Sequence, residues 1–320
     1  MKLNKPKKLL TILVRVLAIG FLCMNLIAFF HAYKFTHFAN AHIEKTQTPE
    51  KLSVLEKVKT LVMGINNPRP KNKLKPDPYE EVLLQSNKKV ACWYRKKNVV
   101  NTQDTIYGTV ILFHGYGGEK STMLDKADEF VKLKYDVLLV DFMGSGASEG
   151  NQTTLGYHEA QEVKAAYNYL NQKGEKNIFL FGTSMGSVAI MKAMADYNLE
   201  AKGLILECPF GSMYQTTCAR FKNMNLPSFP MAYLLVFWGG IQNNFWAFAH
   251  RPVVYANKIY CPTLLLYGEK DKTVSRHEID EIFGNLKGEK ILKTYPNAGH
   301  ENYLLKYSTQ WVTDVKDFLY

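Results

Sequence analysis

The sequence predicts an α/β fold with a mostly parallel central sheet and helices on both of its faces. Short apolar runs of strand length alternate with longer segments of helical character from residue 109 onward. Strands that alternate with helices pair in parallel, because each helix carries the chain back to the edge where the previous strand began. A chain of 320 residues, 47% of them hydrophobic, has enough apolar material for one large domain of this kind and an extension.

The extension opens with a basic and apolar segment at residues 1–32. Lysines at positions 2, 5, 7 and 8 precede an apolar run from Leu9 to Phe30, which is long enough for the ~20 residues of a membrane span. Arg15 interrupts the run near its start, where its side chain can reach the membrane surface. A cleaved signal peptide shares these features, but residues 29–35 (FFHAYKF) offer no clear small-x-small cleavage site. We therefore favour an uncleaved signal-anchor over a secreted protein.

The lysines before the span predict a cytoplasmic N-terminus and a folded domain on the extracytoplasmic side of the membrane. Residues 33–78 are polar and basic and are expected to form a linker. Within this linker, Pro49 in the sequence Thr48-Pro49-Glu50 favours the start of a short helix that runs to Met63. Residues 66–78 (NNPRPKNKLKPDP) have the composition of an irregular connection.

Charge and cysteine content exclude two classes of function. The net charge is +11, but residues 1–100 contain 19 Lys and Arg against 6 Asp and Glu, whereas residues 101–320 contain 21 against 23. A nucleic-acid-binding protein would carry the basic surface on its folded domain, so no nucleic-acid partner is expected. The five cysteines form no C-x-x-C pair and no Cys/His ligand pattern, so no metal site is expected. A disulfide between Cys208 and Cys218 stays open.

The folded domain is expected at residues 79–320, beginning with a hairpin of Glu81–Leu84 and Val90–Tyr94. Strands and helices then alternate, with strands at Thr109–Phe113, Asp136–Val140, Asn177–Phe181, Leu204–Glu207, Pro262–Tyr267 and Ile291–Tyr295, and helices that include Ser121–Leu133 and Tyr157–Leu170. The alternation lapses at residues 211–252, a stretch rich in aromatic residues and too long for an ordinary loop. We interpret it as a helical cap over the active site. The alternative is that its aromatic side chains pack against the main domain.

A serine stands between a predicted strand and a predicted helix, in the sequence Gly182-Thr183-Ser184-Met185-Gly186. A G-x-S-x-G turn in this position exposes the serine hydroxyl at the carboxyl edge of the sheet, because the two glycines let strand and helix approach closely. The following helix dipole favours negative charge at this point. The pattern therefore indicates a nucleophile.

A glycine-rich loop, His114-Gly115-Tyr116-Gly117-Gly118, follows the strand Thr109–Phe113 directly. In a serine hydrolase such a loop presents backbone N–H groups to the carbonyl oxygen of the substrate, and Gly115, Gly117 and Gly118 keep side chains out of the way. Taken alone, the loop is equally typical of an ordinary strand-to-helix connection.

A serine hydroxyl needs a base to take its proton and an acid to orient that base. His300, in Asn297-Ala298-Gly299-His300-Glu301, follows the last predicted strand, so its loop lies at the same sheet edge as Ser184. Asp271 follows the strand Pro262–Tyr267 and is the preferred acid. Glu207, at the end of the preceding strand, is its rival. Asp141, at the end of an earlier strand, is a further candidate that is equally well interpreted as a residue that braces a loop.

Residues 80–320 resemble the α/β-hydrolase superfamily, because G-T-S-M-G, H-G-Y-G-G, G-E-K-D and N-A-G-H occur in the family's order. Within it the chain is similar to the membrane-anchored, monoacylglycerol-lipase-like and serine-aminopeptidase-like branch. The resemblance implies that Ser184 is the nucleophile, His300 the base and Asp271 the acid, with the N–H groups of Tyr116 and Met185 as the oxyanion hole. The family's D-x-R-G-x-G-x-S segment differs here, because Met143 stands where arginine is usual.

The function expected from these features is hydrolysis of a carboxylic ester, lipid-like or short, through an acyl-enzyme and without a cofactor. A peptidase or amidase with the same three residues is the nearest alternative. A non-catalytic, membrane-tethered binding module on this fold is the alternative from another class.

Overall fold

The computed structural model describes residues 5–39, 43–47, 52–73, 75–96 and 105–320. These residues are built around one eight-stranded sheet in the order β1-β2-β4-β3-β5-β6-β7-β8. In the sheet order β4-β3-β5-β6-β7-β8, every pair of neighbouring strands is parallel. Strand β2 pairs antiparallel with both of its neighbours, β1 and β4. The predicted fold class is therefore confirmed. The strands are β1 (Glu80–Gln85), β2 (Lys89–Arg95), β3 (Thr109–Phe113), β4 (Asp136–Val140), β5 (Ile178–Thr183), β6 (Gly203–Glu207), β7 (Thr263–Gly268) and β8 (Lys290–Tyr295).

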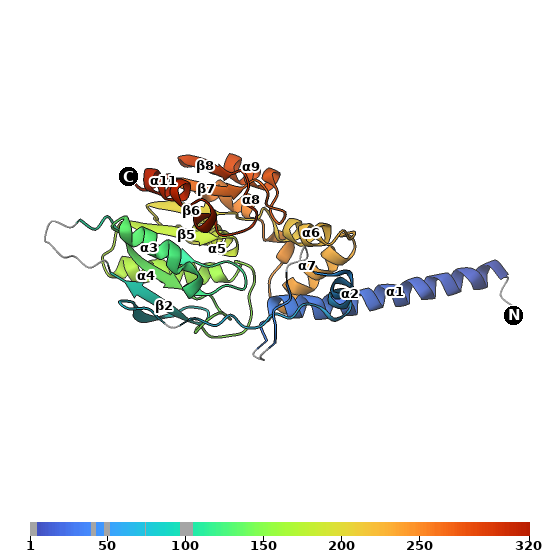
Figure 1. Ribbon diagram of the computed structural model, residues 1–320. Coiled ribbons are helices and arrows are strands. Elements are labelled where there is room, and N and C mark those ends of the chain that lie inside the picture. Colours follow the sequence, from blue (N-terminus) through green and yellow to red (C-terminus); the bar gives the residue numbers. More distant parts are fainter. Residues whose placement is uncertain (1–4, 40–42, 48–51, 74, 97–104) are drawn as a thin grey trace.

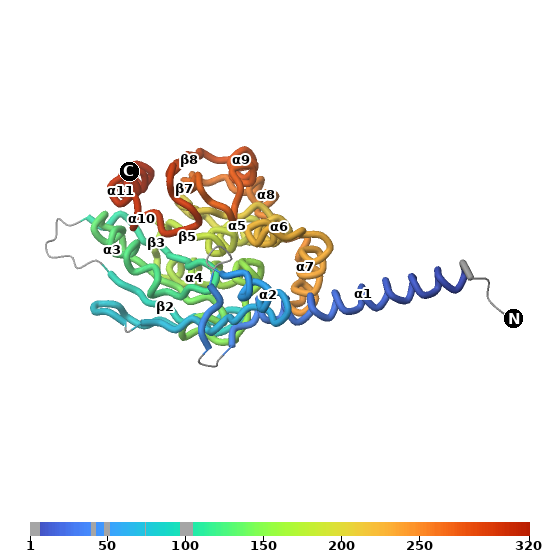
Figure 2. The backbone as a smooth tube through the Cα atoms, turned by 45° about the vertical axis from the view of Figure 1, so that its right-hand side comes forward, coloured from blue at the N-terminus to red at the C-terminus, as the bar shows by residue number. Residues whose placement is uncertain are grey.

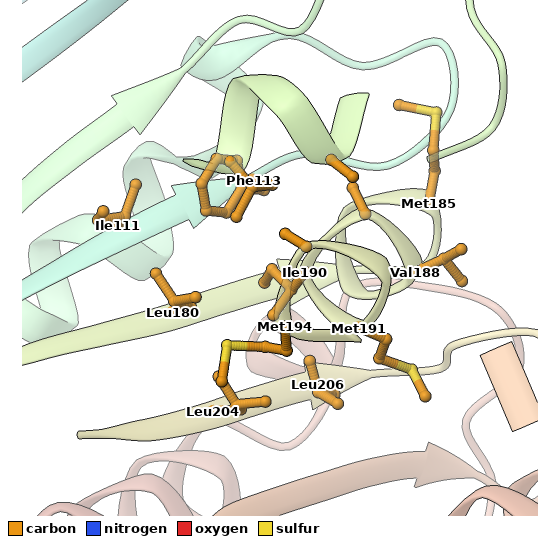
Figure 3. Close-up of a cluster of buried hydrophobic side chains, with 14 of the residues drawn as sticks. Ile111, Phe113, Leu180, Met185, Val188, Ile190, Met191, Met194, Leu204 and Leu206 are labelled. Atoms are coloured by element: carbon orange, nitrogen blue, oxygen red, sulfur yellow. The ribbon is translucent and has the colours of Figure 1, made fainter. Parts of the chain in front are cut away.

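Alternate residues of the central strands enter two apolar cores, because successive side chains of a strand point to opposite faces. Ile111 and Phe113 of β3 belong to the core beneath α4 and α5, whereas Val110 and Leu112 belong to the core beneath α3 and α11. Figure 3 shows the first core, in which the side chains of α5 lie over β5 and β6. The sheet is thus covered on both faces and its site-bearing edge is held rigidly.

The helices divide between these two faces and the N-terminal region. On the first face lie α4 (Glu159–Gln172), α5 (Met185–Tyr197), α8 (Pro252–Tyr255), the 3-10 turn η4 (Ala256–Lys258) and α9 (Arg276–Asn285). On the second lie the 3-10 turn η2 (Lys120–Met123), α3 (Leu124–Lys132), α10 (Tyr303–Lys306) and α11 (Ser308–Leu319). The helix predicted at Ser121–Leu133 is thus split into η2 and α3.

Residues 211–252 contain α6 (Met213–Asn223), α7 (Met231–Gln242) and the 3-10 turn η3 (Ala247–Ala249). Their aromatic side chains pack on one another and on the main domain. Phe248 lies against Tyr233, with ring centroids 4.6 Å apart, inside the segment itself. Phe245 stacks on Tyr157 of the main domain at 4.4 Å. The segment is therefore both a cluster of its own and a layer on the domain. Its position as a cap over the active site stays a prediction.

The N-terminal helix α1 (Lys5–Thr36) projects away from the rest of the molecule, as Figures 1 and 2 show. Its part Lys7–Thr36 is long and apolar enough to cross a membrane, with a mean hydropathy of 2.3 and only 6% of its most apolar window buried. Its C-terminal turns pack on α7. Trp238 Nε1 donates to Asn25 Oδ1 at 3.1 Å, and Gln242 Nε2 donates to the Phe29 carbonyl at 2.9 Å.

The segment after α1 contains a second helix, α2 (Val54–Met63). It ends where the sequence predicted, but it begins at a capping box in which Ser53 and Glu56 bond each other's backbone N–H. The predicted start at residues 48–50 lies outside the described residues. Residues 66–73 form no helix, yet they bond to the domain, since Asn72 Nδ2 donates to Asp141 and Lys73 N donates to Ser121.

Candidate active site

Three side chains from three loops at the carboxyl edge of the sheet are joined by hydrogen bonds. Ser184 Oγ lies 2.9 Å from Nε2 of His300, and Nδ1 of His300 lies 2.7 Å from Oδ2 of Asp271. The loops follow β5, β8 and β7, which are parallel and therefore end at the same edge. The three residues that were predicted to lie close together are thus in contact.

Ser184 occupies a sharp turn between β5 and α5, with φ 52° and ψ −110°. Positive φ is costly for a residue with a side chain, so the surrounding contacts must hold it. A Cβ added to Gly186 would lie 2.3 Å from the Phe113 carbonyl oxygen, and one added to Gly182 would lie 2.5 Å from Gly186 C. Both glycines of the motif are therefore required by close backbone contacts, and the hydroxyl is presented rigidly.

Asp271 is fixed as an acceptor for His300. Its Oδ1 accepts the backbone N–H groups of Thr273 and Val274 at 2.7 and 2.9 Å, and its side chain is fully buried. The loop that bears His300 is tied to the loop of Asp271, since Lys270 N donates to the Ala298 carbonyl at 2.8 Å. The imidazole is thereby held in one orientation, with Nδ1 toward the carboxylate and Nε2 toward the serine.

The pKa of His300 is raised well above 6.5 by its neighbours. Burial of the ring by itself lowers the pKa, because it disfavours the charged form. The Cys208 sulfur and the bonded Asp271 carboxylate act in the opposite direction and outweigh it. The site is therefore arranged to stabilise a protonated imidazole beside the serine.

The glycine-rich loop passes directly beside Ser184. A Cβ added to Gly115 would lie 3.3 Å from the Thr183 carbonyl oxygen and 3.7 Å from Ser184 Cβ. The amide N–H groups of Tyr116 and Met185 have no acceptor among the residues that the structure describes. Tyr116 follows Gly115 and Met185 follows Ser184, so two unengaged backbone donors belong to residues next to this contact. Their role as the oxyanion hole stays a prediction. Gly117, at φ 66°, and Gly118, whose N–H donates to the Gly115 carbonyl, complete the turn.

The two rival acids are engaged elsewhere. Glu207 is buried and accepts from Trp311 Nε1 at 2.7 Å and from Thr183 Oγ1 at 2.9 Å, with Lys126 Nζ 3.6 Å away. Asp141 accepts from the backbone N–H and the Nζ of Lys120, and from Ala147 N at 2.9 Å. Neither carboxylate is bonded to His300.

The chain was compared with protein families, curated proteins and solved structures. Residues 104–235 match the family model described as serine aminopeptidase, S33. The uncharacterized protein YqkD of Bacillus subtilis (strain 168) is 25% identical over 215 residues, which are 66% of this chain and 70% of that protein. The esterase Pf2001 of Pyrococcus furiosus aligns with a TM-score of 0.62 at 22% identity, over 79% of this chain and 98% of that chain. The esterase EaEST of Exiguobacterium antarcticum aligns with a TM-score of 0.56 at 16% identity, over 75% and 99%.

The chain has the fold of the α/β-hydrolases, and its residues 104–235 match the serine aminopeptidase family model. The loop after β4 carries Met143 at the position where an arginine is usual in the family that the sequence resembles. An arginine nevertheless contacts that loop, because the guanidinium of Arg69 donates to the carbonyl oxygens of Gly146, Ser148 and Gly150. Arg69 lies in residues 66–78, the segment predicted to be an irregular connection. No local pattern points to it, since the contact joins residues about eighty positions apart.

Cys208 also lies beside the site, although no role at the site was predicted for it from the sequence. It follows β6 directly, has φ 40°, and its sulfur lies within 4.8 Å of the ligand atoms of Asp271 and His300. These three donors have the spacing of a metal site, although Asp271 and His300 already bond each other. The sequence signal for a position near the site is that Cys208 directly follows the predicted strand Leu204–Glu207. Cys208 and Cys218 are both free thiols, so they form no disulfide here.

A cavity of about 420 Å³ opens beside the glycine-rich loop. Its lining is mostly apolar and comes from α1, α6, α7 and the loop residue Tyr116, with Phe35, Leu155, Leu235 and Phe245 among the wall residues. Leu155 precedes Gly156, at which an added Cβ would lie 3.2 Å from the Met185 carbonyl oxygen. The wall residues Tyr116 and Leu155 are therefore next in sequence to Gly115 and Gly156, which pack against the turn of Ser184, whereas Ser184, Asp271 and His300 do not line the cavity themselves. Helix α1 forms one of its walls.

Proposed function

We propose that this protein is a serine hydrolase that cleaves carboxylic esters. The observation that carries the proposal is the hydrogen-bonded series Ser184, His300 and Asp271, which ends beside two unengaged backbone N–H groups. A nucleophile, its base, the orienting acid and donors for an oxyanion are the four parts that acyl transfer needs. A purely structural role would not require all four at one place.

In the proposed mechanism, Ser184 Oγ attacks the ester carbonyl carbon while Nε2 of His300 takes its proton. Asp271 holds the imidazole and stabilises the imidazolium. The N–H groups of Tyr116 and Met185 bind the oxyanion that forms. His300 then protonates the leaving alcohol. Water attacks the acyl-enzyme by the reverse sequence and releases the carboxylic acid, and the reaction needs no cofactor.

We propose a lipid-like acyl ester as the substrate and α1 as an uncleaved membrane anchor. The apolar cavity beside Tyr116 supports the first part, because such a volume buries an acyl chain. The packing of Asn25 and Phe29 on α7 supports the second, because cleavage after α1 would remove a wall of the cavity. With basic residues before the span, the domain lies on the extracytoplasmic side.

The alternative within the same chemistry is a peptidase, which the family model's description as a serine aminopeptidase favours. An aminopeptidase needs an acidic group to bind the amine of its substrate. The described residues that line the cavity include no Asp or Glu. We therefore place the ester first.

Labelling with a fluorophosphonate tests the proposal on the full-length protein in non-ionic detergent. We expect one label per chain, on the peptide that contains Ser184, and hydrolysis of 4-nitrophenyl esters that varies with acyl length. Matching 4-nitroanilides, including those of amino acids, serve as the amide comparison and should react far more slowly. A folded protein that neither labels nor hydrolyses any ester would contradict the proposal and favour a binding module. Faster cleavage of amino-acid anilides would favour the peptidase.

The pH dependence of kcat/KM follows from the pKa of His300. The base must be neutral to accept the serine proton, so activity is lost as the pH falls through its pKa. Because that pKa is raised above 6.5, we expect the acidic limb of the profile to have its midpoint above pH 6.5. Measurement of kcat/KM for an uncharged ester between pH 5 and 10 checks this, and a midpoint at or below 6.5 would contradict it.

A further inference from the structure

The cavity beside the glycine-rich loop contains positive charge without a matching acid. Arg220 of α6 and Lys45 both line it, and the lining residues that the structure describes include no Asp or Glu. The rest of the lining is mostly apolar. An apolar cavity with uncompensated cations has a positive potential, and this potential is strong because the surroundings screen it weakly.

Arg220 is held by aromatic rings and not by a carboxylate. Its Cζ lies 4.4 Å from the ring centroid of Phe35 and 5.7 Å from that of Tyr116. Within the described part of the chain the side chain has no hydrogen-bond or ion-pair partner. Burial lowers its pKa, the direction expected for a cation away from water and acids. Stacking on ring faces leaves the five N–H donors of a guanidinium free for a ligand.

The two cations contact the loop that carries the proposed oxyanion donor. The rings of Phe35 and Tyr116 stack with centroids 4.7 Å apart, so Arg220 is adjacent to Tyr116. Lys45 Nζ lies 3.4 Å from the Gly117 carbonyl oxygen, one residue further along. A ligand group that contacts Arg220 or Lys45 therefore lies against the loop that carries the proposed oxyanion donor Tyr116.

We propose that the cavity binds an acyl ester that carries an anionic group, a phosphate or a carboxylate, and that Arg220 pairs with this group while Lys45 assists at the rim. The inference rests on the proposed esterase function and names its substrate class. A neutral ester would leave the half-buried guanidinium without an acceptor in the cavity, which is unfavourable. An amine would be repelled, so the same charges disfavour an aminopeptidase substrate.

Two matched pairs of esters test the inference on the full-length protein in non-ionic detergent. The phosphate pair is 1-decanoylglycerol 3-phosphate and 1-decanoylglycerol. The carboxylate pair is the mono-4-nitrophenyl ester of sebacic acid and 4-nitrophenyl decanoate. We expect kcat/KM to be about 10- to 100-fold higher for the anionic member of at least one pair, the range of one charge-assisted hydrogen bond. The pair that shows the preference identifies the anionic group.

The variant Arg220→Gln should abolish most of this preference, whereas Arg220→Lys should keep part of it. Lys222→Gln is the matched control, because Lys222 is an exposed cation on the same helix that does not line the cavity. It should keep the wild-type ratio. Lys45→Gln removes an exposed side chain that bonds only the Gly117 carbonyl among the described residues, and it should lower the ratio several-fold even where Arg220 variants are unstable.

The outcomes separate this inference from the esterase proposal. A protein that labels with fluorophosphonate but hydrolyses neutral and anionic members equally overturns the inference and leaves the esterase intact. An anionic preference that survives in Arg220→Gln, or that Lys222→Gln loses equally, also overturns it, since the preference would then come from general surface charge. A protein that neither labels nor hydrolyses any of the four esters overturns both.

Discussion

Replacing Ser184 with alanine is expected to lower kcat by about 10⁴- to 10⁶-fold and to abolish fluorophosphonate labelling. The proposed acyl-enzyme forms on the Oγ atom, which is 2.9 Å from the base, and no other hydroxyl is bonded to His300 among the described residues. The residual rate would come from the N–H groups of Tyr116 and Met185 alone. Single-turnover hydrolysis of a 4-nitrophenyl ester measures the loss.

Ser187→Ala is the matched control for this variant. Ser187 lies three residues further on, is buried, and donates to the carbonyl oxygens of Gly182 and Glu207 at 2.6 and 2.9 Å. Its loss should lower the free energy of unfolding by roughly 1 kcal/mol, the contribution of a hydrogen bond, while labelling persists. Labelling that persists in Ser184→Ala and vanishes in Ser187→Ala would refute the assignment of the nucleophile.

Replacing Asp271 with asparagine should lower kcat by about 10⁴-fold with little change in KM, because the neutral amide no longer stabilises the imidazolium. An asparagine also presents either a donor or an acceptor to His300, so the ring loses its fixed tautomer. The buried Oδ1 contacts with Thr273 and Val274 keep the side chain in place. Measurement of kcat and KM for an uncharged ester separates this effect from a loss of binding.

Glu207→Gln is the decisive comparison, since Glu207 is the rival acid. Its carboxylate bonds Trp311 and Thr183 and lies 3.6 Å from Lys126 in the core. Neutralising it leaves the buried lysine without its counter-charge, so the melting temperature should fall. The kcat of the folded protein should stay within several-fold of the wild type. A larger loss of kcat in Glu207→Gln than in Asp271→Asn would make Glu207 the acid.

The sequence was sufficient for those parts of the molecule that local pattern controls. The strand Thr109–Phe113 has the same bounds in the structure, because a run of β-branched and apolar residues bounded by glycine allows few alternatives. The loops of Ser184, Asp271 and His300 could be placed at one edge, because parallel strands all end there. Their catalytic roles stay predictions, although their hydrogen bonds are present in the structure.

The features that the sequence did not predict depend on contacts between distant residues. The bond from Trp238 to Asn25 joins residues 213 positions apart, and the contacts of Arg69 cross about eighty. No periodicity or motif reports such a pairing. The start of α2 is a different case. The capping box of Ser53 and Glu56 is a local pattern that marks the start of α2, whereas the prediction rested on the proline at position 49.

Under the proposed membrane anchoring, the attachment of α1 to α7 limits how far the folded domain can reach. A domain on a loose tether could turn over and act on molecules in a facing membrane or in free solution. Here the helix is bonded to α7 through Asn25 and Phe29, and Arg69 bonds the segment behind it to the loop after β4. With α1 as the span, the cavity keeps a constant height and orientation above the bilayer. The enzyme would therefore act in cis, on esters of its own membrane, and its rate would follow their surface density.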